Sequence, residues 1–253
     1  MPENQFPPYI LYGIHVNLAV IIPVFNEAEN IASLLDEITA ALEDRLEYEI
    51  IVVDDGSTDD TPAVLSARRT HCPRLKIIRH QLRCGQTAAL TTGVAAARAI
   101  WIATLDGDGQ NDPADILRLY QVMVQAPDTV WLVAGYRKQR RDSLSKRFAA
   151  RIASGVRYVV LGDRTPDSGC GLKIMAREVF GRLPQFDHMH RFLPALVQRQ
   201  GGRVISVEVH HRARKSGQSK YGIHDRLWIG IVDLLGVLWL QRRSKQPRIV
   251  RED

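Results

Sequence analysis

The chain has 253 residues, 45% of them apolar and 25% charged, and its formal net charge is +6. This size suits one α/β domain with a sizeable core rather than several domains. No apolar run reaches the ~18 residues of a membrane-spanning helix, and the N-terminus lacks the basic and apolar regions of a signal peptide, so we expect neither. The three cysteines lack the spacing of a metal site, which favours reduced thiols in a cytosolic setting.

The charge is distributed unevenly along the chain. Up to Tyr136 there are 9 basic and 18 acidic residues, whereas from Arg137 onward there are 25 basic and 10 acidic residues. A basic half attracts phosphate groups, which can belong to nucleic acid, to anionic lipid or to a phosphorylated acceptor. We expect no nucleic-acid partner, because no known binding module is recognisable and aromatic residues are few. A solvated basic surface without a ligand is the alternative interpretation.

Apolar runs alternate with helical patterns over the first half of the chain. The first helical pattern, after residue 27, places Ile31, Leu34 and Ile38 on one face. Because strands buried on both faces are apolar throughout, the alternation predicts an α/β fold with a Rossmann-like, doubly wound, mainly parallel sheet. The predicted strands are residues 18–25, 48–53, 75–79, 99–105 and 129–134.

Acidic residues follow several of these predicted strands. In such sheets ligands bind beyond the carboxyl ends of the strands, where the ends of neighbouring strands meet. Converging carboxylates repel one another unless a cationic ligand lies between them. We therefore expect a ligand site at this edge, and its acidic residues are Glu27, Asp54, Asp55, Asp106 and Asp108.

The segment from Thr104 to Pro113 carries the most specific of these patterns. Asp106 and Asp108 are two residues apart, so both carboxylates point the same way from an extended strand end. Mg²⁺ or Mn²⁺, held by such carboxylates and by substrate phosphates, would relieve their repulsion, and Gln110 could add a neutral oxygen. The alternative is a polar turn in which Asn111 or Asp112 caps the following helix.

Three motifs resemble, in order, the nucleotide-sugar motifs of glycosyltransferase family 2: Pro23-Val-Phe-Asn-Glu27, Val53-Asp-Asp-Gly-Ser-Thr-Asp59 and Leu105-Asp-Gly-Asp108. Later segments resemble its polyprenyl-phosphate branch, the dolichyl-phosphate mannosyltransferase-like enzymes. They are Gly135-Tyr-Arg137, Asp167-Ser-Gly-Cys-Gly-Leu-Lys173, His190-Arg-Phe192 and Arg214-Lys-Ser-Gly-Gln-Ser-Lys-Tyr221. The resemblance covers residues 18–241 and implies the GT-A fold.

The resemblance also implies roles for individual residues. On the donor side, the nucleotide-sugar would contact Pro23, Phe25, Glu27, Asp54, Asp55, Gly56 and Ser57, while the metal triplet would be Asp106, Asp108 and Gln110. On the acceptor side, Arg137 and the basic segment with Arg147 and Arg151 would bind phosphate. A flexible loop with Arg214, Ser219 and Lys220 would close over the donor. The residues Asp167–Gly171 themselves indicate a tight loop whose glycines permit close backbone approach, in which Asp167 could hydrogen-bond a sugar hydroxyl or be structural. The residues closest to the chemistry would be Asp106, Asp108, Arg137, Arg214 and Lys220.

The segment Leu227–Leu240 is apolar except for Asp233, with Trp228 and Trp239 near its ends and basic residues after it. This pattern is typical of a helix that lies in the interface of an anionic membrane. A helix packed in the core or an oligomer contact is the alternative. Relatives often continue into transmembrane helices after this point, whereas this sequence has no such run, so we expect peripheral association or a membrane-protein partner. The expected organisation is an extension at 1–17, a catalytic domain at 18–222 and an amphipathic segment at 223–253.

The sequence thus predicts an inverting, metal-dependent glycosyltransferase that moves a sugar from a nucleotide diphosphate to a polyprenyl phosphate at the cytoplasmic membrane face. An anionic acceptor phosphate needs no strong general base, since its second pKa is near 6. If the acceptor were a saccharide or glycolipid hydroxyl, Asp187, His188 and His190 would be candidate bases. A catalytically silent sugar-nucleotide scaffold is a further alternative, disfavoured by the intact metal triplet. The sugar and the choice between GDP and UDP stay open.

Overall fold

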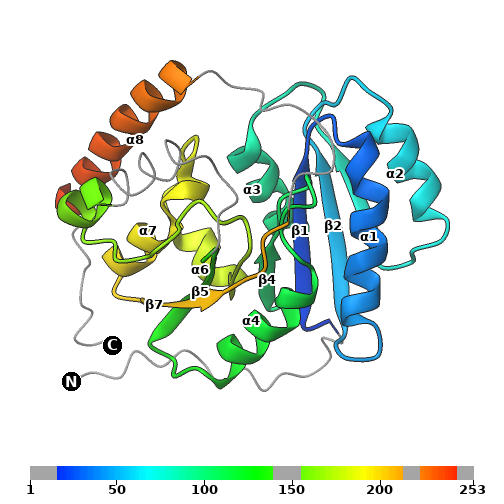
Figure 1. Cartoon of the computed structure of the whole chain (residues 1–253), viewed down its shortest axis with the longest axis horizontal. Coiled ribbons are helices and arrows are strands. Elements are labelled where there is room, and N and C mark those ends of the chain that lie inside the picture. Colours follow the sequence, from blue (N-terminus) through cyan, green and yellow to red (C-terminus); the bar gives the residue numbers. More distant parts are fainter. Residues whose placement is uncertain (1–15, 139–154, 213–222, 244–253) are drawn as a thin grey trace, which may run out of the picture.

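A seven-stranded sheet with the strand order β3-β2-β1-β4-β6-β5-β7 forms the centre of the molecule (Figure 1). The computed structural model describes residues 16–138, 155–212 and 223–243. The strands are β1 (Leu18–Val24), β2 (Tyr48–Asp54), β3 (Leu75–Arg79), β4 (Trp101–Thr104), β5 (Val130–Tyr136), β6 (Lys173–Ala176) and β7 (Arg203–Glu208). The predicted α/β fold with a mainly parallel sheet is confirmed.

One strand runs against the others. β6 pairs antiparallel with both β4 and β5, while β1, β2, β3 and β4 form a parallel set and β5 pairs parallel with β7. β6 was not predicted from the sequence, which indicated only a tight loop at residues 167–171 before it. Its insertion matters for the site, because it brings the segment before Lys173 alongside the end of β4, where Thr104 pairs with Lys173.

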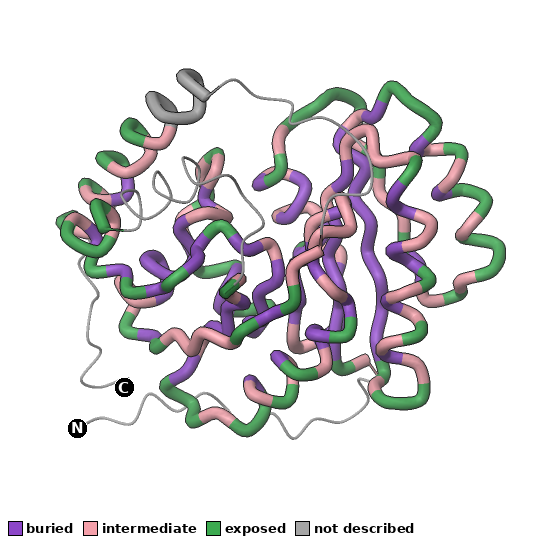
Figure 2. The backbone as a smooth tube through the Cα atoms, viewed as in Figure 1, coloured by how far each residue is buried: buried purple, intermediate pink, exposed green. Residues whose placement is uncertain are grey.

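Two apolar cores cover the two faces of the sheet, and the alternation along β1 shows how. Leu18, Val20 and Ile22 belong to one core, whereas Ala19 and Ile21 belong to the other. Figure 2 shows the buried strands between helices whose outer surfaces are exposed. The helices are α1 (Ala28–Leu42), α2 (Thr61–Arg69), α3 (Gln86–Ala96), α4 (Ala114–Gln125), α6 (Arg177–Arg182), α7 (Leu193–Arg199), α8 (Ile223–Arg243) and the 3₁₀ helix η1 (Met189–Arg191).

The parallel register brings the predicted motifs to one edge of the sheet. Val24 pairs with Asp54 across β1 and β2, and Ile21 pairs with Thr104 across β1 and β4. The pairing continues beyond the strands, because Asp55 N donates to Val24 O over 2.8 Å and Leu105 N donates to Ile21 O over 3.0 Å. The residues after β1, β2 and β4 are therefore neighbours.

The C-terminal helix α8 has two different faces. Val237 is fully buried in the second core, with Leu234 and Leu238 packed against that core, whereas Leu235 and Trp239 are 58% and 60% exposed. One face of the helix thus packs on the domain, as the alternative interpretation expects, whereas membrane contact of the open face stays a prediction. Within the described residues, the structure contains no helix that is long and apolar enough to cross a membrane.

The packing of α3 on the sheet depends on a glycine. A Cβ atom at Gly93 would lie 2.4 Å from Ile21 Cγ2 and 3.2 Å from Val53 Cγ2, and Ile21 is buried and branched at Cβ. We expect Gly93→Ala to lower the free energy of unfolding by about 1–3 kcal/mol, because overpacking displaces α3. Gly181→Ala is the control, since Gly181 lies in α6 with open space around it. Urea denaturation measures both, and equal stability of the two variants would contradict the prediction.

Candidate functional site

The first two predicted motifs are joined by hydrogen bonds between the loops after β1 and β2. Asn26 adopts a left-handed backbone (φ 55°), and its amide donates to Ser57 Oγ over 2.9 Å, while its side-chain oxygen accepts from Thr58 N over 2.8 Å. Glu27 N donates to Thr61 Oγ1 over 2.9 Å. Phe25 lies beside this contact, and the guanidinium of Arg83 is 4.3 Å from the centre of its ring. These loops therefore form one surface next to the end of β1.

The two neighbouring aspartates of the second motif are both buried, and both hold backbone. Asp54 is fully buried, and its carboxylate accepts a 2.8 Å hydrogen bond from Ser57 N. Gly56 (φ 73°) follows in a left-handed turn, and a Cβ there would lie 2.9 Å from the Arg83 backbone. The role that this geometry gives to Asp54 is to shape the turn between β2 and α2.

Asp55 anchors the loop between β3 and α3. Its carboxylate accepts hydrogen bonds from Cys84 N and Gly85 N, both 2.8 Å long, and contacts His80 Nδ1 at 2.8 Å. His80 Nε2 in turn lies 2.9 Å from Thr92 Oγ1. The side chains of Asp55, His80 and Cys84 lie close enough together to hold an ion. Because three N–H groups already occupy the Asp55 carboxylate, we interpret the group as a loop anchor.

The metal triplet lies beyond β4. Asp106 Oδ1 accepts a 2.9 Å hydrogen bond from Gln86 Nε2, and Asp108 Oδ1 accepts one of 3.2 Å from Gln110 N. A Cβ at Gly171 would lie 2.2 Å from an Asp106 oxygen, so only glycine allows the chain before β6 to approach this carboxylate. Burial, and then the charge of Asp108, raise the pKa of Asp106 to about 6. A cation between the two carboxylates would relieve this cost.

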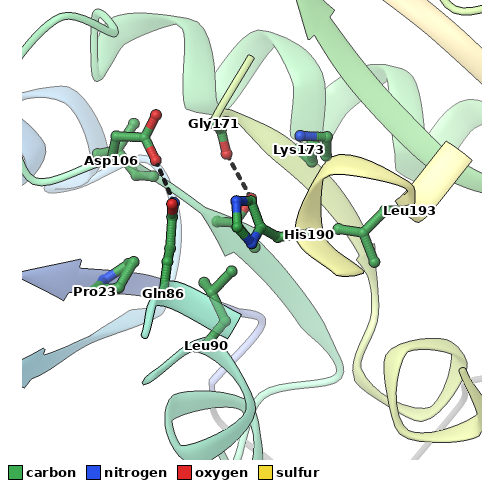
Figure 3. A pocket seen from close by; sticks show the side chains of 10 residues that line it. Pro23, Gln86, Leu90, Asp106, Gly171, Lys173, His190 and Leu193 are labelled. Atoms are coloured by element: carbon green, nitrogen blue, oxygen red, sulfur yellow. Dashed lines mark hydrogen bonds between the residues drawn. The ribbon is translucent and has the colours of Figure 1, made fainter. Parts of the chain in front are cut away.

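A narrow pocket opens beside Asp106 (Figure 3). Lys173, buried at the start of β6, donates from Nζ to the carbonyl of Cys170, and burial lowers the pKa of this lysine. His190 Nδ1 lies 2.9 Å from Thr87 Oγ1, and burial lowers the pKa of His190 well below its ordinary value, so this imidazole is neutral. The pocket is lined by Pro23, Gln86, Leu90, Thr104, Leu105, Asp106, Gly171, Lys173, His190 and Leu193.

Two predicted residues of the acceptor and sugar side bind each other. Arg137 donates from Nε to Asp167 Oδ2 over 2.6 Å and from Nη2 to Oδ1 over 2.9 Å. Burial disfavours the charged form of Arg137. The hydrogen bonds to Asp167 and the charge of that carboxylate outweigh this effect and raise the pKa of Arg137 above its ordinary value. Arg137 thus offers any ligand a charge that is already shared with a carboxylate.

The segment after β7 is attached to the loop of the metal triplet. Arg212 N donates to Gln110 O over 2.9 Å, and its guanidinium contacts Asp112 at 2.7 Å and also pairs with Glu37. This attachment sets where the chain enters residues 213–222. The predicted residues Arg147, Arg151, Arg214, Ser219 and Lys220 lie outside the described residues.

The raised pKa of Asp106 predicts how the stability of the cation-free protein depends on pH. An unfolded aspartate titrates near 3.9, so between about pH 4 and pH 6 the folded state binds more protons and its stability falls as the pH rises. We expect a higher Tm at pH 5 than at pH 7.5 in EDTA, and Asp106→Asn should reduce this difference. Asp128→Asn, at an exposed position, is the control. Identical pH profiles of the Asp106 variant and the wild type would refute the assignment.

The family model of Glycosyl transferase family 2 matches residues 19–183. The chain is 36% identical to a dodecaprenyl-phosphate galacturonate synthase of Rhizobium johnstonii over 243 residues, which are 92% of this chain and 69% of that protein. Over 208 residues it is 32% identical to an undecaprenyl-phosphate 4-deoxy-4-formamido-L-arabinose transferase of Aeromonas hydrophila. These residues are 81% of this chain and 63% of that protein.

A solved structure with the same fold is glucosyl-3-phosphoglycerate synthase from Mycobacterium tuberculosis. Its TM-score is 0.67 at 20% identity, with 89% of this chain and 80% of that chain covered. This likeness supports the fold alone, which agrees with the predicted GT-A architecture. The family model and the first relative confirm the family and the enzyme class predicted from the ordered motifs. The chain belongs to glycosyl transferase family 2.

Proposed function

We propose that the protein transfers a sugar from a nucleotide diphosphate to a polyprenyl phosphate, with inversion at the sugar carbon. The observation that carries this proposal is the position of Asp106 and Asp108. They lie between the loops joined by Asn26 and Asp55 and the pair formed by Arg137 and Asp167. The relatives named above are a dodecaprenyl-phosphate synthase and an undecaprenyl-phosphate transferase, which supports the acceptor class.

Mg²⁺ or Mn²⁺ fits the side chains at the end of β4. Asp106 and Asp108 supply the two carboxylates and Gln110 a neutral oxygen, and the raised pKa of Asp106 indicates a site that favours a positive charge. The Mycobacterium enzyme of the same fold was crystallised with Mn²⁺ and UDP-glucose, and with Mg²⁺ and UDP. When bound, the cation would act as a Lewis acid on the departing diphosphate.

The remaining residues would orient the reactants. The loop anchored by Asp55 would hold the nucleotide, and the sugar would lie at the mouth of the narrow pocket with His190 and Lys173. An oxygen of the acceptor phosphate would attack the anomeric carbon as the bond to the diphosphate breaks on the opposite face, which inverts the configuration. Arginines in the basic half, including Arg147 and Arg151, would hold the acceptor phosphate near the anionic donor.

A hydroxyl acceptor is the second candidate, and His190 favours it. This imidazole is neutral and lines the pocket, so it could accept the proton that a hydroxyl must lose. A phosphate acceptor has no such proton to lose at neutral pH. Replacement of His190 by asparagine therefore separates the two reactions by kcat, which should fall severely only with a hydroxyl acceptor.

A panel of labelled donors tests the reaction class and identifies the sugar. GDP-mannose, UDP-glucose and UDP-linked uronic and amino sugars are each incubated with undecaprenyl phosphate and Mg²⁺ or Mn²⁺. We expect one donor to label an organic-extractable, acid-labile lipid, and we expect EDTA to abolish the transfer. Asp108→Ala should lower kcat by at least about 100-fold, whereas Asp128→Ala should not. Transfer without a divalent cation, or full activity of Asp108→Ala, would exclude the proposed role of the triplet.

We further propose that the open face of α8 binds the membrane surface at its cytoplasmic side, as a peripheral contact. Ile231, Val232, Leu235 and Trp239 follow helical spacing on this face, and all are exposed. Exposed Arg242 and Arg243 follow at the end of the helix, where they would meet anionic headgroups. The segment 155–161, with exposed Val159, adjoins the same end through a 3.0 Å hydrogen bond from Gln241 to Leu161 O.

Liposome binding tests this surface. Leu235→Asn combined with Trp239→Ser should lower the affinity for vesicles of phosphatidylglycerol and phosphatidylcholine by about tenfold or more, since two large apolar side chains leave the interface. Val124→Asn is the control, because Val124 is an exposed apolar residue on α4, away from α8 in Figure 1. Sedimentation with vesicles measures the affinity. Unchanged binding of the double variant would argue for a different membrane contact or for a protein partner.

A further inference from the structure

Asp233 is the single acidic residue in the apolar segment 227–240, and it lies on the packed side of α8. Its carboxylate Oδ2 is 3.1 Å from His188 Nδ1, and the two side chains are 15% and 25% exposed. Oδ2 is buried and accepts no hydrogen bond within the part of the chain that the structure describes. Burial of a carboxylate costs free energy because the group loses its contacts with water, and an apolar side chain at this position would not carry that cost. Leucine at position 233 would suit a membrane contact or the packing of α8 better than aspartate does.

His188 has an unusual backbone conformation. It is a non-glycine residue in the left-handed region (φ 61°, ψ 9°), which costs about 1–2 kcal/mol for an L-residue. Its amide donates to Asp187 Oδ1 over 2.8 Å, and its imidazole faces Asp233. The turn begins η1 immediately, since Arg191 N donates to His188 O over 3.0 Å. The contact with α8 thus lies at the residue where the chain changes direction.

The same turn presents one wall of the pocket. Two residues further on, His190 lines the pocket and contacts Thr87 at 2.9 Å, and Leu193 lines it as well. Thr87 follows Gln86, which donates to Asp106. A short row of contacts therefore leads from α8 through η1 and the start of α3 to the metal triplet.

We propose that Asp233 and His188 are positioning residues, whose contact fixes the turn before η1 and so holds the pocket wall opposite Asp106 in place. This inference rests on the proposed function, in which the transferred sugar lies at the mouth of that pocket. Without the contact, His188 can leave the left-handed region, and His190 moves with it. The nucleotide loop has its own anchor, because Cys84 N and Gly85 N donate to Asp55, so we expect its contacts to persist. The two residues thus act on recognition of the sugar, and not on recognition of the nucleotide.

Two variants test the pair without removing a group that touches substrate. Asp233→Leu continues the apolar face of α8, and His188→Asn removes the imidazole while keeping a residue that tolerates the left-handed region. We expect each to raise the KM for the nucleotide-sugar about tenfold, with a smaller change in kcat and unchanged affinity for the free nucleoside diphosphate with Mn²⁺. The double variant should be no worse than the more severe single variant. Gly236→Ala, at a position of α8 with open space around it, is the matched control and should leave KM unchanged.

Hydrogen exchange followed by mass spectrometry gives a readout that needs no substrate. Residues 186–193 should exchange faster in Asp233→Leu than in the wild type, while residues 61–69 of α2, which packs on α1 and β3, should not change. This measurement separates the inference from the proposed function, because it stands even if no donor in the panel is used. Wild-type exchange at 186–193 in both variants would overturn the inference. So would a wild-type KM together with tighter vesicle binding of Asp233→Leu, which is the result expected if Asp233 acts only on the helix.

Discussion

The repulsion between Asp106 and Asp108 is the constraint on which the rest of the site depends. Both carboxylates extend from the end of a buried strand, and burial and proximity raise the pKa of Asp106 to about 6. Gln86 supplies one hydrogen bond to Asp106, and Gly171 permits the close approach of the chain before β6. In the proposed function, a divalent cation would offset the remaining repulsion and, through it, hold a diphosphate at this edge.

Other charges near the site are already balanced within the protein. Asp55 is held by three N–H groups, Arg137 by Asp167, and Asp233 faces His188. These contacts give the loops fixed positions before any substrate arrives, which lowers the cost of organising the reactants. Arg212, the last described residue before 213–222, is held in the same way by its contacts with Gln110 and Asp112.

α8 connects the chemistry with the proposed membrane surface. Its packed face contributes Val237 to the core and Asp233 to the turn before η1, while its open face presents Leu235 and Trp239. The backbone of α8 also accepts a hydrogen bond from Arg199 at Leu240 O, which attaches the helix to α7. A helix attached in this way can set the height of the pocket above a bilayer. Polyprenyl phosphates keep their phosphate at the bilayer surface, so such a height would matter for transfer.

Much of this protein was determined by local sequence pattern. The continuous apolar strands, the helical spacing after Glu27 and the acidic residues after β1, β2 and β4 predict the parallel sheet and the edge that carries the site, because period and strand ends are local properties. The ordered motifs likewise identified the family. The sequence alone did not decide which face of α8 is exposed and which is packed, because an apolar run with one aspartate suits either environment.

Only the tertiary structure decided which distant residues meet. The antiparallel insertion of β6 brings Gly171 and Lys173 to the end of β4, and α3 brings Gln86 to Asp106. Gly171 and Lys173 were predicted only as parts of a motif, and Gln86 was not predicted as a site residue. Arg137 and Asp167 were predicted for separate ligands, yet they bind each other. Such pairings join segments tens of residues apart and depend on strand order and register. Local periodicity does not encode strand order or register, because both depend on how the whole sheet packs.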